Sequence, residues 1–294
     1  METAPAVVFT YNRLEKTRTV LDALGRNSLA KDTDLYIFND AANPSRPQDE
    51  EKVKAIREYL SDYQKNSPFR NVELHLAPEH QGLAKSVIAG ADMILEKYGS
   101  IIVTEDDLVS HENYLEYMNN ALNYYKDDER VWSISGYTWP LETMKNRSEV
   151  YFTYRGSSWG WGTWKDRWET VDWSMKDYDG IFFHKERRHN LAMAGRDLFK
   201  MLHDQKHGIV DSWAVRWCFE ESRHQKATVY PAQTFLHNIG MDGSGSHGVA
   251  DGNDSWTDLK PIEYRLIPYK LEKEVLNEFA RNYEDPYFHT IQKF

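Results

Sequence analysis

The chain has 294 residues, with 36 Lys and Arg against 46 Asp and Glu, which gives a formal net charge of -10. Binding to nucleic acid needs a clustered cationic surface, so this balance argues against nucleic acid as the main partner. The single Cys218 excludes an internal disulfide framework, and without a membrane-length apolar run or a signal-peptide pattern we expect a cytoplasmic protein, with peripheral membrane association left open.

The first 108 residues alternate apolar strands with amphipathic helices. Strands are predicted at 6–10, 34–40, 72–76 and 101–108, and helices at 14–24, 48–63 and 83–98. A β-α-β-α-β-α-β series of this kind is typical of an α/β fold with a mixed, mainly parallel sheet flanked by helices.

The periodicity is less regular after Trp139. Helices are predicted at 113–125, 191–203 and 211–223, and strands at 131–136, 150–154 and 228–230. Residues 158–168 form an aromatic and glycine-rich segment, and residues 240–252 form a Gly/Ser-rich loop. The packing of the tail from Leu271 onward stays unassigned.

Three consecutive carboxylates end the apolar strand that begins at Ile101. They are Glu105, Asp106 and Asp107, and in parallel α/β sheets ligands bind beyond the carboxyl ends of the strands. Acids concentrated there repel one another unless a cation neutralises them. Their oxygens suit Mn²⁺ or Mg²⁺, which could in turn carry phosphate oxygens. The alternative is a solvated acidic turn at a strand end.

The order of these elements resembles the nucleotide-sugar-binding half of the GT-A glycosyltransferases. The triplet matches the Glu-Asp-Asp form of the DxD motif, as in N-acetylglucosaminyltransferase I and bacterial family-2-like enzymes. Further similar segments follow in the family's order, at residues 10–13, 38–40, 158–164, 210–213 and 243–248. The resemblance implies a GT-A (Rossmann-like) fold over residues 1–294. Its nucleotide-sugar-binding half would span residues 1–108, its acceptor and catalytic half 109–260, and its C-terminal tail 261–294.

The resemblance also implies roles for the residues at the strand ends. Asp107 would hold the metal, Asp106 the donor ribose or a metal-bound water, and Glu105 the sugar. Arg13 would contact the diphosphate, and Asp40 would accept a hydrogen bond from N3–H of uracil. For Asp40 an Asx-turn role is an equal alternative, and for Arg13 an exposed position at a helix start. Thr10 and Lys85 complete the nucleotide-sugar-binding residues predicted for this half.

The second half would supply the acceptor site. By resemblance, Asp211 is the catalytic base of an inverting reaction, with helix capping as its alternative role. Glu220 and Glu221 are reserve candidates, which we expect to be surface charges. Trp161 could stack on a sugar ring, with a place in a packed aromatic core as an equal alternative. Ser246 and His247 would belong to a loop that closes over the donor phosphates.

These features together predict a metal-dependent, inverting glycosyltransferase with Mn²⁺ or Mg²⁺ as cofactor. It would move a sugar from a nucleotide-sugar donor, a UDP-sugar by resemblance, to a hydroxyl of a carbohydrate or glycoconjugate acceptor, as in polysaccharide biosynthesis. One alternative is a non-catalytic carbohydrate-binding protein of the same fold. Another is a sugar nucleotidyltransferase, although residues 10–13 lack the glycines that a triphosphate-binding loop needs.

Overall fold

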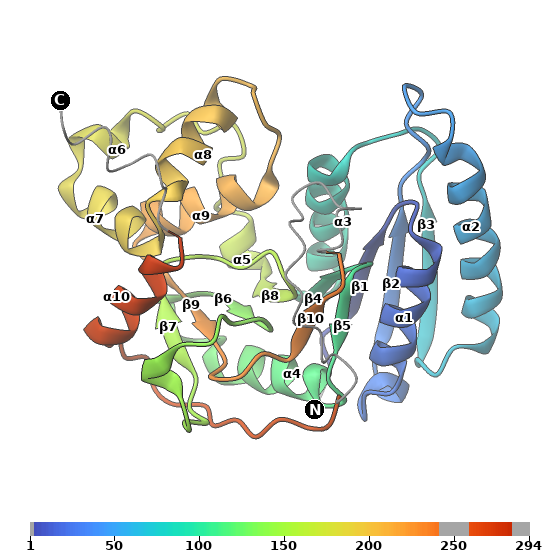
Figure 1. Ribbon diagram of the computed structural model, residues 1–294, viewed down its shortest axis with the longest axis horizontal. Coiled ribbons are helices and arrows are strands. Elements are labelled where there is room, and N and C mark those ends of the chain that lie inside the picture. The colour runs from blue at the N-terminus through green and yellow to red at the C-terminus, as the bar shows by residue number, and fades with distance from the viewer. Residues whose placement is uncertain (1–2, 241–258, 284–294) are drawn as a thin grey trace.

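The computed structural model describes residues 3–240 and 259–283, and its first half is the predicted alternating series. Strands β1, β2, β3 and β4 lie in the order β3-β2-β1-β4 and are parallel (Figure 1). The bounds are β1 Ala6–Thr10, α1 Leu14–Gly25, β2 Asp34–Asn39, α2 Asp49–Asn66, β3 Asn71–Leu76, α3 Leu83–Tyr98 and β4 Ser100–Glu105. The mainly parallel α/β fold is therefore confirmed for this half.

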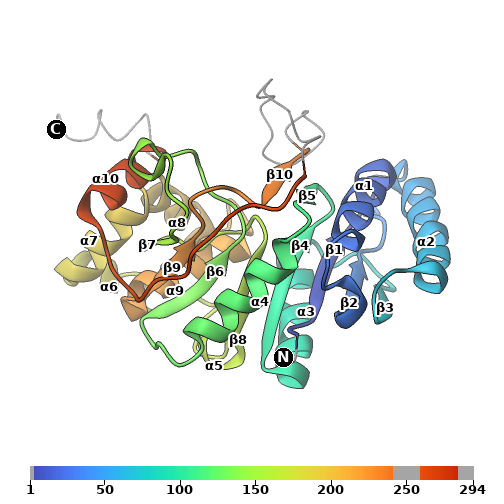
Figure 2. The same ribbon diagram turned by 90° about the horizontal axis from the view of Figure 1, so that it is seen from below.

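The second half extends the same sheet. The order across the eight strands found in the described ranges is β3-β2-β1-β4-β8-β6-β9-β7, and β8 is antiparallel to both of its neighbours. The elements are β5 Leu108–Ser110, α4 Tyr114–Tyr125, β6 Val131–Ser135, β7 Tyr151–Thr153, β8 Trp161–Trp164, α5 Lys165–Trp168, α6 Gly180–Phe183, α7 Lys185–Ala194, α8 Asp197–Lys206, α9 Trp213–His224, β9 Ala227–Tyr230, β10 Leu236–Asn238 and α10 Lys273–Arg281. Strands β5 and β10 form a separate antiparallel pair, visible beside the main sheet in Figure 2.

Alternate residues of the central strands face two different cores. Ala6 and Val8 of β1 pack with residues of α1, α2 and α4, whereas Val7 and Phe9 pack with residues of α3 and α9. This alternation is the two-residue period of a strand that is buried on both faces. Helices therefore cover both sides of β1, and the strand ends are the open edge at which a ligand can reach the sheet.

Two predictions for the second half need correction. The helix predicted at 191–203 is two helices, α7 and α8, because Gly195 has φ = +134°, a backbone conformation outside the helical region. The aromatic segment 158–168 contains β8, which pairs with β4 through the register Val103 to Trp161. Its glycines masked this strand, since glycine is depleted in strands and weakens the pattern used to find them.

The C-terminal segment packs along the body of the protein. Its extended part follows α4, where the Asn113 side chain donates to the carbonyl of Ile262 at 2.8 Å and the Tyr125 hydroxyl to that of Ile267 at 2.6 Å (Figures 1 and 2). Helix α10 then packs on β7 and β9 through Phe279, which is fully buried. No helix of the described ranges is both long and apolar enough to cross a bilayer.

We predict that Phe279→Ala lowers the free energy of unfolding by about 3–5 kcal/mol, because it removes a fully buried ring from the core. Phe183→Ala is the matched control, since that ring is 82% exposed, and it should change stability by less than about 0.5 kcal/mol. Urea denaturation of both variants measures the difference. Equal stability of the two variants would show that α10 does not belong to the folded core.

Candidate functional site

A cavity of about 440 Å³ opens beyond the carboxyl ends of β1, β2 and β4. Its wall also includes residues in the first turn of α3, Trp159 shortly before β8, and Asn238 at the end of β10. The lining residues are Phe9, Thr10, Tyr11, Asn12, Arg13, Phe38, Asp40, Asn43, Arg46, His80, Gly82, Leu83, Ser86, Glu105, Asp106, Asp107, Trp159, Asn238 and Gly240. The cavity therefore lies where ligands bind in open α/β sheets.

Three acids and one arginine meet at the β4 end of this cavity. Glu105 is the last residue of β4, and Asp106 and Asp107 follow it. Arg13, directly before α1, forms an ion pair with Asp106, and its Nη1 lies 2.9 Å from Oδ2 of Asp107. The backbone N–H of Tyr11 also donates to Asp106 at 3.4 Å. Arg13, which we expected on a diphosphate, is thus bound to two of the acids.

Burial and mutual repulsion raise the pKa values of the acids at this end. Burial, together with the charges of Asp107 and Asp106, raises the pKa of Glu105 to about 8, although Arg13 acts to lower it. Burial also raises the pKa of Asp106, which Arg13 only partly offsets. In Arg13 itself burial acts to lower the pKa, but attraction to Asp106 and Asp107 outweighs it and the pKa is raised. One guanidinium pairs with two of the three carboxylates, Asp106 and Asp107.

The acids fit a divalent cation in their chemistry. They supply oxygen ligands of the kind that Mg²⁺ and Mn²⁺ prefer, and the Glu105 carboxylate has no ion pair or hydrogen bond to a described residue. Within the described residues, however, no three His, Cys, Asp or Glu side chains converge to form a ready site. Arg13 is the present counter-ion of Asp106 and Asp107. A metal held by Asp107 and Glu105 would have to share Asp107 with Arg13.

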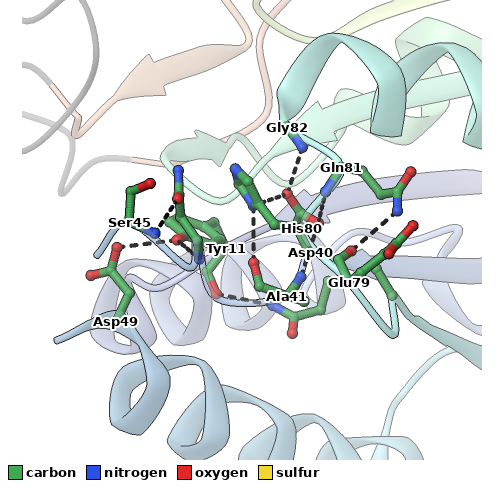
Figure 3. A network of polar contacts seen from close by, with 12 residues as sticks. Tyr11, Asp40, Ala41, Ser45, Asp49, Glu79, His80, Gln81 and Gly82 are labelled. Atoms are coloured by element: carbon green, nitrogen blue, oxygen red, sulfur yellow. Dashed lines mark hydrogen bonds and ion pairs between the residues drawn. The ribbon is translucent and has the colours of Figure 1, made fainter. Parts of the chain in front are cut away.

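Asp40, at the β2 end of the cavity, is the centre of a hydrogen-bond network (Figure 3). Its Oδ1 accepts the backbone N–H groups of Ala41 at 2.9 Å and Gln81 at 2.8 Å. Its Oδ2 accepts that of Gly82 at 2.9 Å and lies 2.8 Å from Nδ1 of His80. Asp40 thereby ties the end of β2 to the residues that precede α3.

This network bears directly on the uracil assignment. A carboxylate offers about four lone-pair positions, and Asp40 already has four partners. A uracil N3–H would be a fifth donor at a side chain that is only 9% exposed. The arrangement favours a structural role for Asp40, in which it anchors the chain before α3.

Thr10 also lies at the cavity, and its side chain is engaged with β2. Its hydroxyl donates to the carbonyl of Phe38 at 3.3 Å and accepts from the Asn39 amide at 3.0 Å. Lys85 is exposed on α3 and is absent from the cavity wall. Ser246 and His247 lie outside the described residues.

The predicted sugar contact of Trp161 needs correction. Trp161 is fully buried, and its ring packs against those of Trp168 and Trp213 at centroid distances of 5.4 and 5.0 Å. A ring without exposed surface cannot stack on a sugar. Trp159 is the tryptophan of this segment that lines the cavity, and its ring packs edge-on against Tyr137 at 4.6 Å.

Asp211 precedes α9, and its side chain is 73% exposed and pairs with Arg216 at 2.8 Å. The capping residue of α9 is Ser212, whose hydroxyl accepts the N–H of Val215 at 3.3 Å, so Asp211 is not the N-cap. Asp211 does not line the cavity. Figure 1 shows the connection between α8 and α9 on the side of the second half that faces α3, and α3 and α9 are in contact.

The reserve candidates Glu220 and Glu221 are not surface charges. Both are fully buried within α9. Glu220 pairs with Arg223 at 2.6 Å, and Glu221 accepts the hydroxyl of Thr228 at 2.9 Å. Burial raises the pKa of Glu221 well above its usual value. The helical pattern from Trp213 onward could have indicated that these positions face inward, because Trp217 lies one turn before Glu220 and Glu221.

Several cavity residues were not predicted from the sequence. Tyr11, Asn43, Arg46 and His80 line the β2 end. They lie in loops, where neither hydrophobic periodicity nor spacing marks a residue as functional. The one available signal was that residues 11–13 and 40–46 follow strands whose carboxyl ends share an edge.

No protein-family model matches the chain, and no curated protein matches it in sequence. Among solved structures, TarS of S. aureus matches in its 1–349 form at 13% identity over 80% of this chain and 60% of that chain, with a TM-score of 0.45. In a longer TarS structure the match, at 11% identity and a TM-score of 0.33, covers 45% of this chain and only 21% of that chain. The mannosyltransferase PcManGT of Pyrobaculum calidifontis, in complex with GDP-Man and Mn²⁺, matches at 13% identity with a TM-score of 0.40. The match covers 76% of this chain and 69% of that chain. A cytidylyltransferase of Leptospira borgpetersenii matches at 11% identity with a TM-score of 0.33, and the match covers 57% of this chain and 63% of that chain. At these scores the function has to be argued from the site residues.

We predict that Asp40→Ala lowers the free energy of unfolding by about 2–3 kcal/mol, because it leaves backbone N–H groups before α3 without acceptors. Asp127→Ala, at an exposed position after α4, is the control and should change it by less than about 0.5 kcal/mol. Urea denaturation gives both values. A variant at Asp40 as stable as the control would contradict the structural role.

Proposed function

We propose that this protein is a nucleotide-sugar-dependent glycosyltransferase that uses a divalent metal and inverts the anomeric centre. The observation that carries the proposal is the composition of the cavity. Its β4 end holds acids and Arg13, and its β2 end holds the rings of Tyr11 and His80 beside Arg46 and the hydrogen-bonded Asp40. A nucleoside diphosphate has the same two parts, a charged diphosphate and a flat base, so the cavity matches this class of ligand in kind.

At the charged end, the phosphate oxygens of the donor would be a second partner for Arg13. Its planar guanidinium can bind phosphate oxygens as well as carboxylates. When a diphosphate enters, Arg13 would pass from Asp106 and Asp107 to the phosphates, and the freed Asp107 would be available for the cation together with Glu105. A divalent metal in this position would neutralise charge on the departing diphosphate. Asp107 and Glu105 are the residues proposed to hold it.

At the open side Trp159 and Asp211 are the proposed acceptor-site residues. Trp159 gives the sugar a ring on the cavity wall in place of Trp161. The exposed Asp211 carboxylate would take the proton of the acceptor hydroxyl. As that oxygen bonds to the anomeric carbon, the bond from this carbon to the diphosphate breaks on the opposite face, which inverts the centre.

The primary test is a thermal-shift panel of nucleotide sugars with and without Mn²⁺. A donor at about 100 times its Kd should stabilise the native state by about 2.7 kcal/mol and raise Tm by about 5 °C or more. We predict that UDP-sugars give this shift only with Mn²⁺ and that Asp107→Asn abolishes it. Asp127→Asn, an exposed acid far along the chain, should keep the full shift.

Two outcomes of the panel would count against the proposal. If no nucleotide sugar shifts Tm, the cavity is not a donor site. If a donor binds but is never hydrolysed or transferred to any glycan in a long incubation, the protein is a binding protein of the same fold.

We predict that Asp211→Asn lowers turnover at least 100-fold while the Kd of the donor stays within about twofold, because a general base acts on the acceptor and not on donor binding. The measurement is donor hydrolysis, or transfer once an acceptor is found, beside donor titration calorimetry. Asp179→Asn, another exposed acid of the second half, is the control. Near-normal turnover would move the base to another residue.

A further inference from the structure

We propose that His80, positioned by Asp40, is the residue that recognises the base of the donor nucleotide. The proposal rests on the function proposed above, because it assigns the β2 end of the cavity to the base. It adds that the recognised group is the ring N3–H of uracil and that the acceptor is Nε2 of the His80 imidazole. Asp40 then acts only through His80.

The contacts of His80 fix which ring nitrogen carries the proton. Nδ1 lies 2.8 Å from Oδ2 of Asp40 and 3.0 Å from the carbonyl oxygen of Ala41 (Figure 3). A carbonyl oxygen can only accept, so Nδ1 must donate. In a neutral imidazole the other nitrogen is then an acceptor.

Nε2 of His80 is available for a ligand. The His80 side chain is 26% exposed and lines the cavity, and Nε2 makes no hydrogen bond to a described residue. The Asp40 carboxylate, in contrast, already accepts three backbone N–H groups and lies against Nδ1 of His80. The acceptor that this end of the cavity offers to a base is therefore the imidazole.

The surroundings of His80 suit a flat base with carbonyl groups. The Tyr11 ring lies 5.7 Å from that of His80, and its hydroxyl donates to Asp49 at 3.1 Å and accepts the N–H of Asn43 at 3.0 Å, which fixes the loop after β2. Arg46 extends from that loop to the cavity wall and has no carboxylate partner among the described residues. Arg46 can donate to a carbonyl oxygen of the base.

These two groups favour one pattern of base edge. Uracil presents a ring N–H between two carbonyl oxygens, which matches an acceptor beside a cationic donor. Cytosine has no ring N–H at that position and presents an amino group beside an acceptor. The separation of the two ends of the cavity also suits a nucleoside diphosphate. Strands β2 and β4 are two strand spacings apart, about 10 Å, so the diphosphate of a nucleotide with its base at His80 would lie near Arg13.

The test compares UDP with N3-methyl-UDP, in which a methyl group replaces the ring proton. The measurement is calorimetric titration at pH 8 with Mn²⁺. The wild-type protein should bind UDP at least about tenfold more tightly than N3-methyl-UDP, and CDP should bind about as weakly as the methylated analogue. His80→Ala should bind UDP and N3-methyl-UDP within about twofold of each other.

Two further variants make the result specific. His80→Asn retains an acceptor oxygen and should recover part of the preference for UDP, provided that its circular dichroism matches the wild type. His189→Ala, at an exposed position on α7, should keep the whole preference. The measured quantity is a ratio of two affinities in one variant, so a general loss of stability does not imitate it.

The outcomes separate this inference from the function on which it rests. If the wild type binds no nucleotide at all, the proposed function fails. If it binds UDP and His80→Ala still prefers UDP over N3-methyl-UDP by tenfold, only the role of His80 is overturned. If CDP, GDP or ADP binds more tightly than UDP, the uracil assignment is overturned while a nucleotide site remains.

Discussion

The ion pairs of Arg13 with Asp106 and Asp107 are the interaction on which the site depends. Acids held together away from water are costly unless a cation compensates them, and breaking such a pair is more costly still. The fold brings the partners together because β1 and β4 are paired in parallel, with Phe9 opposite Glu105. Residues that follow these strands must then lie side by side. The sheet register thus sets the charge balance of the cavity.

The two ends of the cavity differ in how far their polar groups are satisfied. Asp40 has a partner for each acceptor position, so it fixes backbone and leaves nothing for a ligand. Asp106 and Asp107 share one guanidinium, and burial together with their charges raises the pKa of Glu105. Polar groups whose hydrogen bonds are made within the protein hold the shape of a site, whereas polar groups without such partners are available to a ligand. This distinction is why a ligand charge is proposed at Arg13 and a ligand N–H at His80.

Much of the first half could be predicted from the sequence, because strands buried on both faces and amphipathic helices leave strong periodic patterns. The patterns placed Thr10, Asp40 and Glu105 at or near strand ends, and all three lie at the cavity, although the strand predicted at 101–108 ends at Glu105. Which side chains are free for a ligand could not be predicted. The saturation of Asp40 depends on the N–H groups of Gln81 and Gly82, which are 41 and 42 residues away in the chain. Burial of Trp161 likewise depends on Trp213, which the sequence alone does not place against it.

The buried aromatic cluster has a mechanical consequence for the open side of the cavity. Trp217 of α9 packs in the core against Trp161 and Trp168. Glu221, also of α9, accepts a hydrogen bond from the hydroxyl of Thr228 in β9. A helix anchored through one face by rings and through a strand by a buried carboxyl has little freedom to rotate. Asp211, which directly precedes the capping residue Ser212, therefore lies next to a fixed helix end although its side chain is exposed. For a group such as Asp211, this combination of a fixed backbone and an open side chain is what a large acceptor would require.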